Sequence, residues 1–166
     1  PAAEAYLEPM AQQAQRLTLE RYGRTLQLYL PLYLSNVCSN SCVYCGFSVE
    51  HHIRRRRLTL AEIDREVAAI KELGFRHLLL VSGEDLRASS WRYYLEVVKH
   101  LRPHFAQLSL EVQPLETEQY AALGKAGISY VCVYQETYHE AAYPKYHLQG
   151  KKADYRYRLE TPDRIA

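Results

Sequence analysis

Short apolar runs alternate with helical segments along most of the chain, and this alternation restricts the fold more than any other feature. Strands are predicted in residues 24–35, 77–81, 108–112 and 130–134, and helices in residues 59–73, 91–101 and 117–125, with another helix starting near Asp154. Strands separated by helices in this way are typical of parallel β/α units. The sequence therefore predicts an α/β fold built on a parallel sheet.

Local signals mark the ends of several elements. Thr59 and Glu62 form the capping-box pattern that begins a helix, and Gly74 is typical of a helix end. In the first strand, Pro31 cannot donate a hydrogen bond to a neighbouring strand. We therefore expect the part of residues 24–35 that follows Pro31 to be an extended loop.

The N-terminal residues differ from this pattern. Residues 2–19 have helical spacing, and Gly23 is expected to end the helix. We therefore divide the chain into an N-terminal helical segment, residues 1–23, and a partial barrel, residues 24–166. Because four β/α units cannot close an eight-stranded barrel, we expect the barrel to continue beyond residue 166, with an open half-barrel that needs a partner as the alternative.

Composition narrows the class of protein. Of the residues, 48% are hydrophobic and 24% are charged, as in a folded globular protein. The net charge of +2 gives no case for nucleic acid or membrane partners, and from the apolar runs and the N-terminal residues we expect neither a membrane span nor a signal peptide. Three of the four cysteines are clustered, whereas Cys132 lies in an apolar run and is expected to be a buried free thiol. This is not a disulfide framework, so we expect a cytoplasmic protein.

The clustered cysteines form a C-x3-C-x2-C loop, Cys38, Cys42 and Cys45, directly after the first strand. A structural zinc site takes four ligands, usually in two pairs, and a ferredoxin cluster takes four cysteines. Three thiolates on one loop leave a metal coordination position open, and an open position is where chemistry occurs. His51 or His52 could supply a fourth ligand to zinc, so a zinc-stabilised binding module is the alternative.

Polar residues also follow the later strands at their carboxyl ends. Chemistry in parallel β/α folds collects at these ends. We therefore expect the residues there to face the same cavity as the cysteine loop, with the two glutamines as hydrogen-bond partners of undefined role. These residues are Ser82, Gly83, Glu84, Gln113, Gln135 and Glu136.

Longer motifs make the expectation more specific. The chain resembles the radical S-adenosylmethionine (SAM) tyrosine lyases from about Tyr22 to its end. The resemblance is carried by the cysteine loop with its Tyr44-Cys45-Gly46-Phe47 ending, by Tyr134-Gln135-Glu136-Thr137-Tyr138, and by Leu159-Glu160-Thr161-Pro162-Asp163-Arg164. The last of these motifs resembles the branch of thiamine biosynthesis, the 2-iminoacetate synthases. The tyrosine lyases of hydrogenase maturation, which hold a second cluster on a C-terminal cysteine pair, are the nearest alternative.

The resemblance implies a radical SAM TIM-type (β/α) barrel, here a partial barrel of about four β/α units. It implies a lyase that breaks the Cα–Cβ bond of L-tyrosine to give 2-iminoacetate (dehydroglycine) and p-cresol, with 5′-deoxyadenosine and methionine formed from SAM. The imine would supply the thiazole moiety of thiamine diphosphate. The implied partners are an electron donor, of the flavodoxin or ferredoxin type or driven by NADPH, and the thiazole synthase.

The resemblance also implies roles for single residues. Cys38, Cys42 and Cys45 would bind three irons of a [4Fe–4S] cluster, and SAM would bind the fourth. The superfamily's Gly-Gly-Glu motif, which accepts hydrogen bonds from the SAM ammonium group, corresponds here to Ser82, Gly83 and Glu84. Contacts to the ribose, carboxylate and adenine of SAM are expected from Glu136, Arg158 and Tyr44. No catalytic residue is assigned beyond the cluster and SAM.

Residues 51–57 contain two histidines and four arginines. Alone, such a run could bind phosphate, but no aromatic interleaving or nucleic-acid-binding motif accompanies it. We expect a solvated loop that leads into the helix at residues 59–73. A docking surface for the reductant or for the thiazole synthase is the alternative.

Overall fold

The computed structural model describes residues 4–166. Its helices are α1 (Glu4–Tyr22), α2 (Leu60–Glu72), α3 (Trp91–Leu101), α4 (Thr117–Ala126), α5 (Tyr155–Leu159) and α6 (Thr161–Ile165), with two short 3₁₀ helices, η1 (Tyr143–Lys145) and η2 (Lys151–Ala153). Its strands are β1 (Leu30–Ser35), β2 (Ser41–Cys42), β3 (His77–Ser82), β4 (Gln107–Glu111), β5 (Ile128–Val131) and β6 (His147–Gln149).

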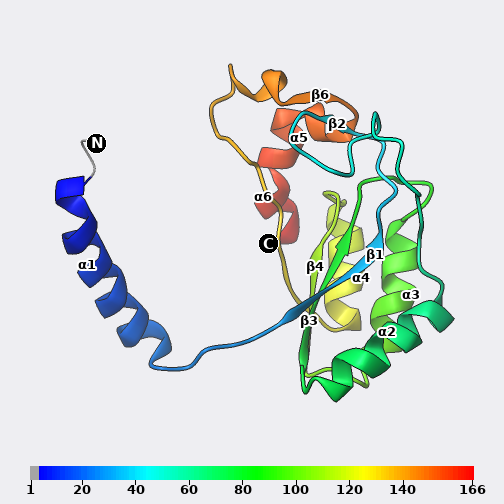
Figure 1. Ribbon diagram of the computed structural model, residues 1–166, viewed down its shortest axis with the longest axis horizontal. Helices are drawn as coiled ribbons and strands as arrows, with labels where there is room; N and C mark the ends of the chain where they lie inside the picture. Colours follow the sequence, from blue (N-terminus) through cyan, green and yellow to red (C-terminus); the bar gives the residue numbers. More distant parts are fainter. Residues whose placement is uncertain (1–3) are drawn as a thin grey trace.

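Four of the strands form a parallel sheet in the order β1-β3-β4-β5. Each strand of this sheet therefore pairs with the sheet strand that precedes it along the chain. Helices α2, α3 and α4 connect these strands on one side of the sheet (Figure 1). Successive parallel neighbours joined by helices are the arrangement of a (β/α) barrel wall. The predicted α/β fold and the partial barrel of four strands are confirmed.

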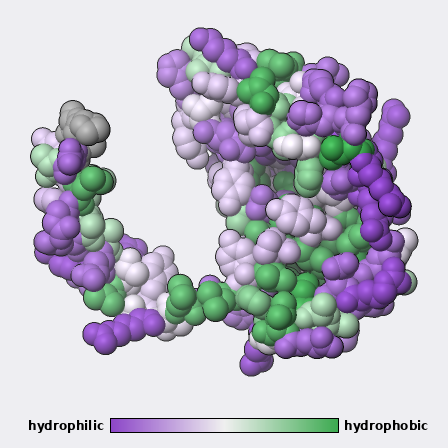
Figure 2. All heavy atoms as spheres, viewed as in Figure 1, coloured by the Kyte–Doolittle hydropathy of each residue, from purple (hydrophilic) through white to green (hydrophobic). Residues whose placement is uncertain are grey.

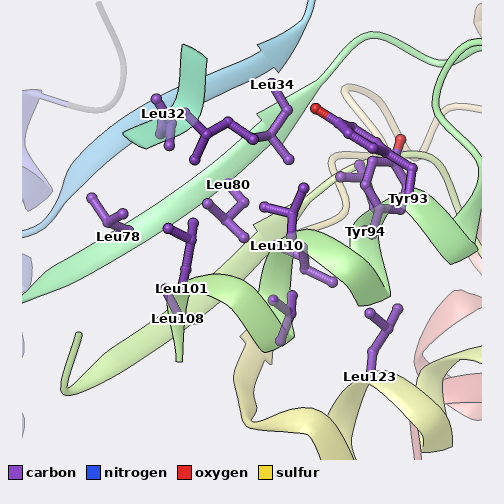
Figure 3. Packing of buried hydrophobic residues seen from close by; sticks show 14 of the residues in the cluster. Leu32, Leu34, Leu78, Leu80, Tyr93, Tyr94, Leu101, Leu108, Leu110 and Leu123 are labelled. Atoms are coloured by element: carbon purple, nitrogen blue, oxygen red, sulfur yellow. The ribbon is translucent and has the colours of Figure 1, made fainter. Parts of the chain in front are cut away.

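The core lies between this sheet and the three helices. Alternate residues of the strands point towards the helices, where their leucine side chains are buried against apolar residues of α2, α3 and α4 (Figure 3). Burying one such leucine stabilises the fold by about 1.5–3 kcal/mol. The residues on the strands are Leu32, Leu34, Leu78, Leu80, Leu108 and Leu110.

The start of α2 has the predicted capping box. The Thr59 side chain accepts a hydrogen bond from the backbone N–H of Glu62, and the Glu62 carboxylate accepts one from the backbone N–H of Thr59 at 2.8 Å. Two N–H groups at the helix start thus gain partners within the chain. The helix ends before Gly74, whose φ of +80° favours glycine, as predicted.

We expect Thr59→Ala to lower the free energy of unfolding by about 1 kcal/mol, because the cap of α2 is lost. Urea unfolding of the variant beside Thr59→Ser, which keeps the hydroxyl, measures this. Equal destabilisation by both substitutions would contradict the capping role.

The bounds of the first strand were predicted wrongly. Residues 24–29 lie outside any strand, with Leu26 81% exposed and Leu28 65% exposed, whereas β1 includes Pro31 and runs on to Ser35. The apolar side chains of the segment between α1 and β1 are open to solvent (Figure 2). Proline is tolerated here because β1 lies at one edge of the four-stranded sheet.

Helix α1 stands away from the sheet (Figure 1), and none of its residues is buried. It ends at Tyr22, just before Gly23, which has a φ of +63° and was predicted as the stop. The predicted start near Ala2 lies outside the described residues. The division of the chain at residue 23 stays a prediction. Within residues 4–166, no helix is both long enough and apolar enough to cross a bilayer.

Candidate functional site

A pocket of about 250 Å³ opens at the carboxyl ends of the strands. Its wall comes from β1 and the cysteine loop after it, the ends of β3 and β4 with the residues that follow them, the residues after β5, and one residue each of η2 and α5. All the residues predicted to bind the cluster or SAM line this one pocket, although their roles as ligands stay predictions. They are Cys38, Cys42, Tyr44, Cys45, Ser82, Gly83, Glu84, Glu136 and Arg158.

The cysteine loop is held by pairing that the sequence did not reveal. Strand β2, inside the loop, pairs antiparallel with β6, and Figure 1 places this small sheet over the end of the large one. The loop then turns back on itself, since the N–H of Cys45 donates to the Cys42 carbonyl at 3.2 Å and the N–H of Ser48 donates to the Cys45 carbonyl at 3.0 Å. Cys42 is buried, whereas Cys38 and Cys45 are half-buried.

The electrostatics of the loop oppose ionisation of its middle thiol. Burial raises the pKa of Cys42 to about 11, with further upward contributions from Cys45 and Cys38, while the nearby Lys152 opposes the shift. A metal ligand must be a thiolate, so binding of a metal centre here releases protons, and the positive charge of the metal offsets the repulsion between the thiolates.

The residues present fit an iron–sulfur cluster. They offer three soft thiols on one pocket wall, and the backbone N–H of Phe47 donates to the Cys45 sulfur at 3.4 Å, a type of contact that tunes cluster sulfurs. Across residues 4–166, no three His, Cys, Asp or Glu side chains lie close enough together to hold a single metal ion. His51 and His52 are exposed and do not line the pocket, so neither stands ready as a fourth zinc ligand there.

Gly83 allows the loop after β3 to pack against the cysteine loop. A Cβ atom at this position would lie 2.4 Å from the Val37 carbonyl oxygen and 3.3 Å from the Cys38 Cβ, so a larger residue would force the two loops apart. The contact is secured from the other side, because Ser39 donates to the Glu84 carbonyl through both its backbone N–H and its hydroxyl, each at 3.0 Å.

Glu84 and Arg158 form an ion pair at the pocket wall. The Arg158 residue is only 4% exposed, and the second oxygen of Glu84 accepts a hydrogen bond from the Asn40 side chain at 2.9 Å. The Arg158 Nε is buried and finds no acceptor among the described residues. Because an unpartnered buried donor is unfavourable, an acceptor on a bound ligand would stabilise this site.

Glu136 is held in an unusual backbone conformation. Its φ of +67° is the only positive φ of a non-glycine residue in the described part of the chain. Strain of this kind often accompanies a functional position. The Glu136 carboxylate accepts a hydrogen bond from Lys152 Nζ at 2.8 Å, and the Lys152 backbone N–H donates to Asn40 Oδ1 at 3.0 Å. Lys152 and Asn40 line the pocket, and neither was predicted.

Tyr44 is fixed by a histidine that was also missed. The Tyr44 hydroxyl lies 2.6 Å from His147 Nε2, and the other ring nitrogen of His147 lies 3.0 Å from the Tyr143 carbonyl oxygen. Burial raises the pKa of Tyr44 and lowers the pKa of His147, so both are neutral near pH 7. The Tyr143 ring packs on His147 with centroids 3.9 Å apart.

The prediction for the two glutamines was wrong. Gln113 is buried away from the pocket, where its Oε1 accepts a hydrogen bond from the Tyr94 hydroxyl at 2.7 Å and its Nε2 donates to the Ser89 carbonyl at 2.8 Å. Gln135 donates to the Tyr155 carbonyl at 3.3 Å and does not line the pocket either. Both side-chain amides therefore make hydrogen bonds within the fold and not to the pocket: Gln113 bonds the Tyr94 hydroxyl and a backbone carbonyl, and Gln135 bonds a backbone carbonyl.

The last part of the wall follows β5, which ends earlier than predicted. Cys132 was predicted to be a buried thiol inside a strand, but it follows Val131 at the strand end, is only half-buried and lines the pocket. Glu111, at the end of β4, lies on the same wall, and burial raises the pKa of its carboxyl group.

An α/β partial barrel that gathers three thiols beside a pocket at the carboxyl ends of its strands has the architecture of an iron–sulfur enzyme. Comparison with known proteins specifies the class further. The chain belongs to the radical SAM superfamily, whose family model matches residues 32–166. Members of this superfamily use a [4Fe–4S] cluster and SAM.

Individual relatives are similar over nearly the whole chain. The 2-iminoacetate synthases of Escherichia coli (strain K12) and Salmonella typhimurium (strain LT2) are each 54% identical over 165 residues, which cover 99% of this chain and 44% of each relative. The crystal structure of HydG, a maturase of the [FeFe]-hydrogenase, has a TM-score of 0.91 and 33% identity, and covers 98% of this chain and 37% of that structure. The chain thus spans less than half the length of these relatives.

Proposed function

We propose that this chain is the part of a 2-iminoacetate synthase that binds the cluster and SAM. The whole enzyme would cleave the Cα–Cβ bond of L-tyrosine to 2-iminoacetate and p-cresol for the thiazole moiety of thiamine. The observation that carries the proposal is the 54% identity to two 2-iminoacetate synthases over 99% of the chain. The gathering of all the predicted ligands at one pocket supports it.

Different residues of the chain hold the cluster and SAM. Cys38, Cys42 and Cys45 hold the cluster, and the pocket beside them receives SAM. When bound, the cluster and SAM supply the electron and the 5′-deoxyadenosyl radical with which hydrogen abstraction from L-tyrosine begins. The protein's own contribution is to position these groups and to exclude water.

The wall of the pocket has complementary groups for the charged end of SAM. The Glu84 carboxylate and the carbonyls of Ser82 and Gly83 are acceptors for its ammonium group. Arg158 suits its carboxylate, because the guanidinium is permanently charged and its Nε still lacks an acceptor. Glu136 accepts from the ribose hydroxyls, and the Tyr44 ring borders the adenine.

A tyrosine lyase of hydrogenase maturation is the second candidate, favoured by the TM-score of 0.91 to a maturase of the [FeFe]-hydrogenase. Identity separates the two, since it is 33% to that structure and 54% to the 2-iminoacetate synthases. A second cluster separates them experimentally: about four irons per chain supports the thiamine branch, and about eight supports the maturase. For the 2-iminoacetate synthase, the proposed partners are an electron donor, of the flavodoxin or ferredoxin type or driven by NADPH, and the thiazole synthase.

The proposal is tested with the full-length protein that contains this chain, reconstituted with iron and sulfide without oxygen. We expect 5′-deoxyadenosine and p-cresol to form from SAM and L-tyrosine under reducing conditions, and no p-cresol to form when L-phenylalanine replaces L-tyrosine. A brown protein that cleaves SAM but releases no p-cresol would contradict the tyrosine lyase. A colourless protein with one zinc ion would favour the binding module instead.

A further inference from the structure

One arginine of the basic run is turned into the molecule. The Arg55 guanidinium donates four hydrogen bonds to backbone carbonyl oxygens, and all four acceptors lie close to the cysteine loop. Its Nη1 donates to Asn36 and Phe47, each at 2.8 Å, and its Nη2 donates to Ser48 at 2.7 Å and His51 at 3.2 Å. A planar guanidinium can hold several acceptors in a fixed arrangement, which a lysine cannot reproduce.

The acceptors lie on both sides of the thiols. Asn36 precedes Cys38, and Phe47 follows Cys45. The Arg55 side chain therefore links the segment that enters the cysteine loop to the segment that leaves it. The Phe47 residue is held twice, because its carbonyl accepts from Arg55 while its N–H donates to the Cys45 sulfur at 3.4 Å. Fixing this segment thus also fixes a hydrogen bond to a predicted cluster ligand.

The backbone around Arg55 is held just as firmly. The Asn36 N–H donates to the Arg56 carbonyl at 3.1 Å, the Asn36 side chain donates to the Arg54 carbonyl at 2.9 Å, and the Arg56 N–H donates to Asn36 Oδ1 at 2.6 Å. These contacts fix the position of the basic run relative to Asn36. As a result, the Arg55 side chain lies at the base of the cysteine loop.

The other arginines of the run make different contacts. Arg56 forms an ion pair with Glu62 on α2, and Arg57 lies over the Tyr93 ring at 4.7 Å from its centroid. The Arg54 side chain is exposed. The predicted solvated loop is confirmed for residues 51–54, 56 and 57, which are exposed, whereas the half-buried Arg55 supports the cysteine loop.

We propose that Arg55 is a positioning residue that closes the three-cysteine loop and holds the hydrogen bond to the Cys45 sulfur in place. This inference rests on the proposed cluster function. It does not depend on any residue outside this chain, because all four acceptors lie within it. Without the guanidinium, four carbonyls at the base of the loop lose a charged donor, and each such hydrogen bond contributes appreciably to stability. The loop then opens more often and exposes the cluster.

The test compares Arg55→Gln, Arg55→Lys and Arg55→Ala with Arg54→Gln as the matched control in the full-length, reconstituted protein. The rate of iron loss to a ferrous chelator and the spectrum of the reduced cluster are measured without oxygen. We expect Arg55→Gln to lose iron at least about tenfold faster and with an altered spectrum, Arg55→Lys to fall between, and Arg54→Gln to match the unaltered protein. Added guanidinium ion should slow the loss of iron from Arg55→Ala and leave the rate in the other proteins unchanged.

Arg55→Lys and the guanidinium rescue keep the test decisive if Arg55→Gln folds poorly. Iron loss and spectra equal to those of the unaltered protein in both Arg55→Gln and Arg55→Lys would overturn the inference, and so would equal effects of Arg54→Gln and Arg55→Gln. An unaltered protein that takes up no cluster would instead refute the proposed function.

Discussion

Cys42→Ala in the full-length enzyme will abolish the formation of 5′-deoxyadenosine and lower the bound iron after reconstitution. Cys42 is the buried middle thiol of the loop, and it lies within the short β2 strand that pairs with β6. Two remaining thiols cannot hold a cluster at three corners, so SAM is left without the electron that cleaves it. Iron analysis and chromatography of the reaction mixture measure both effects.

The fourth cysteine provides the control for this experiment. Cys132 also lines the pocket, but it lies outside the loop. Cys132→Ala should therefore take up as much iron as the unaltered protein. Reductive cleavage of SAM at the normal rate by Cys42→Ala would rule out the assigned ligands, and so would a loss of iron confined to Cys132→Ala.

The second large effect is expected from Glu84→Ala. The substitution leaves the buried Arg158 without its ion-pair partner, which destabilises a protein by about 3–5 kcal/mol at comparable sites. It also removes the proposed acceptor of the SAM ammonium group, so we expect SAM affinity to fall by about 10–100-fold. Iron content should change far less, because Glu84 is not a predicted cluster ligand. Urea unfolding and equilibrium binding of SAM measure the two effects.

Two further variants separate charge from shape at this position. Glu84→Gln keeps an oxygen for the Asn40 amide but removes the negative charge beside Arg158, so it should lose SAM affinity while retaining part of the stability. Asp85→Asn changes a neighbouring charge outside the pocket lining and should bind SAM normally. If Glu84→Ala kept its SAM affinity and lost its iron, the assignment of Glu84 would be wrong.

Features with a local cause could be predicted from the sequence. The capping box at Thr59 and the glycine stops at Gly23 and Gly74 depend on residues a few positions apart, and the structure has all of them. Eight of the nine predicted pocket residues could be expected to lie together, because carboxyl ends of parallel strands share one edge of a sheet, whereas Arg158 on α5 was expected there only from the family resemblance.

Features with a distant cause could not be predicted. β2 and β6 are two and three residues long, too short for an alternating pattern, so neither their pairing nor His147 beside Tyr44 has a signal in the sequence. Pro31 stays in a strand because of where β1 lies in the sheet. Gln113 points away from the pocket because its side chain bonds the Tyr94 hydroxyl on α3. Arg55 points inward because its guanidinium bonds carbonyls beside the cysteine loop. Each outcome depends on a contact formed only in the folded chain.

The central claim is a cluster held by three cysteines with one iron free for SAM. It is tested most directly by electron paramagnetic resonance of the reduced, oxygen-protected full-length protein before and after SAM is added. We expect a [4Fe–4S] signal that changes when SAM binds and that is absent from Cys42→Ala. A signal that SAM leaves unchanged, or a protein that takes up zinc and no iron, would contradict the account.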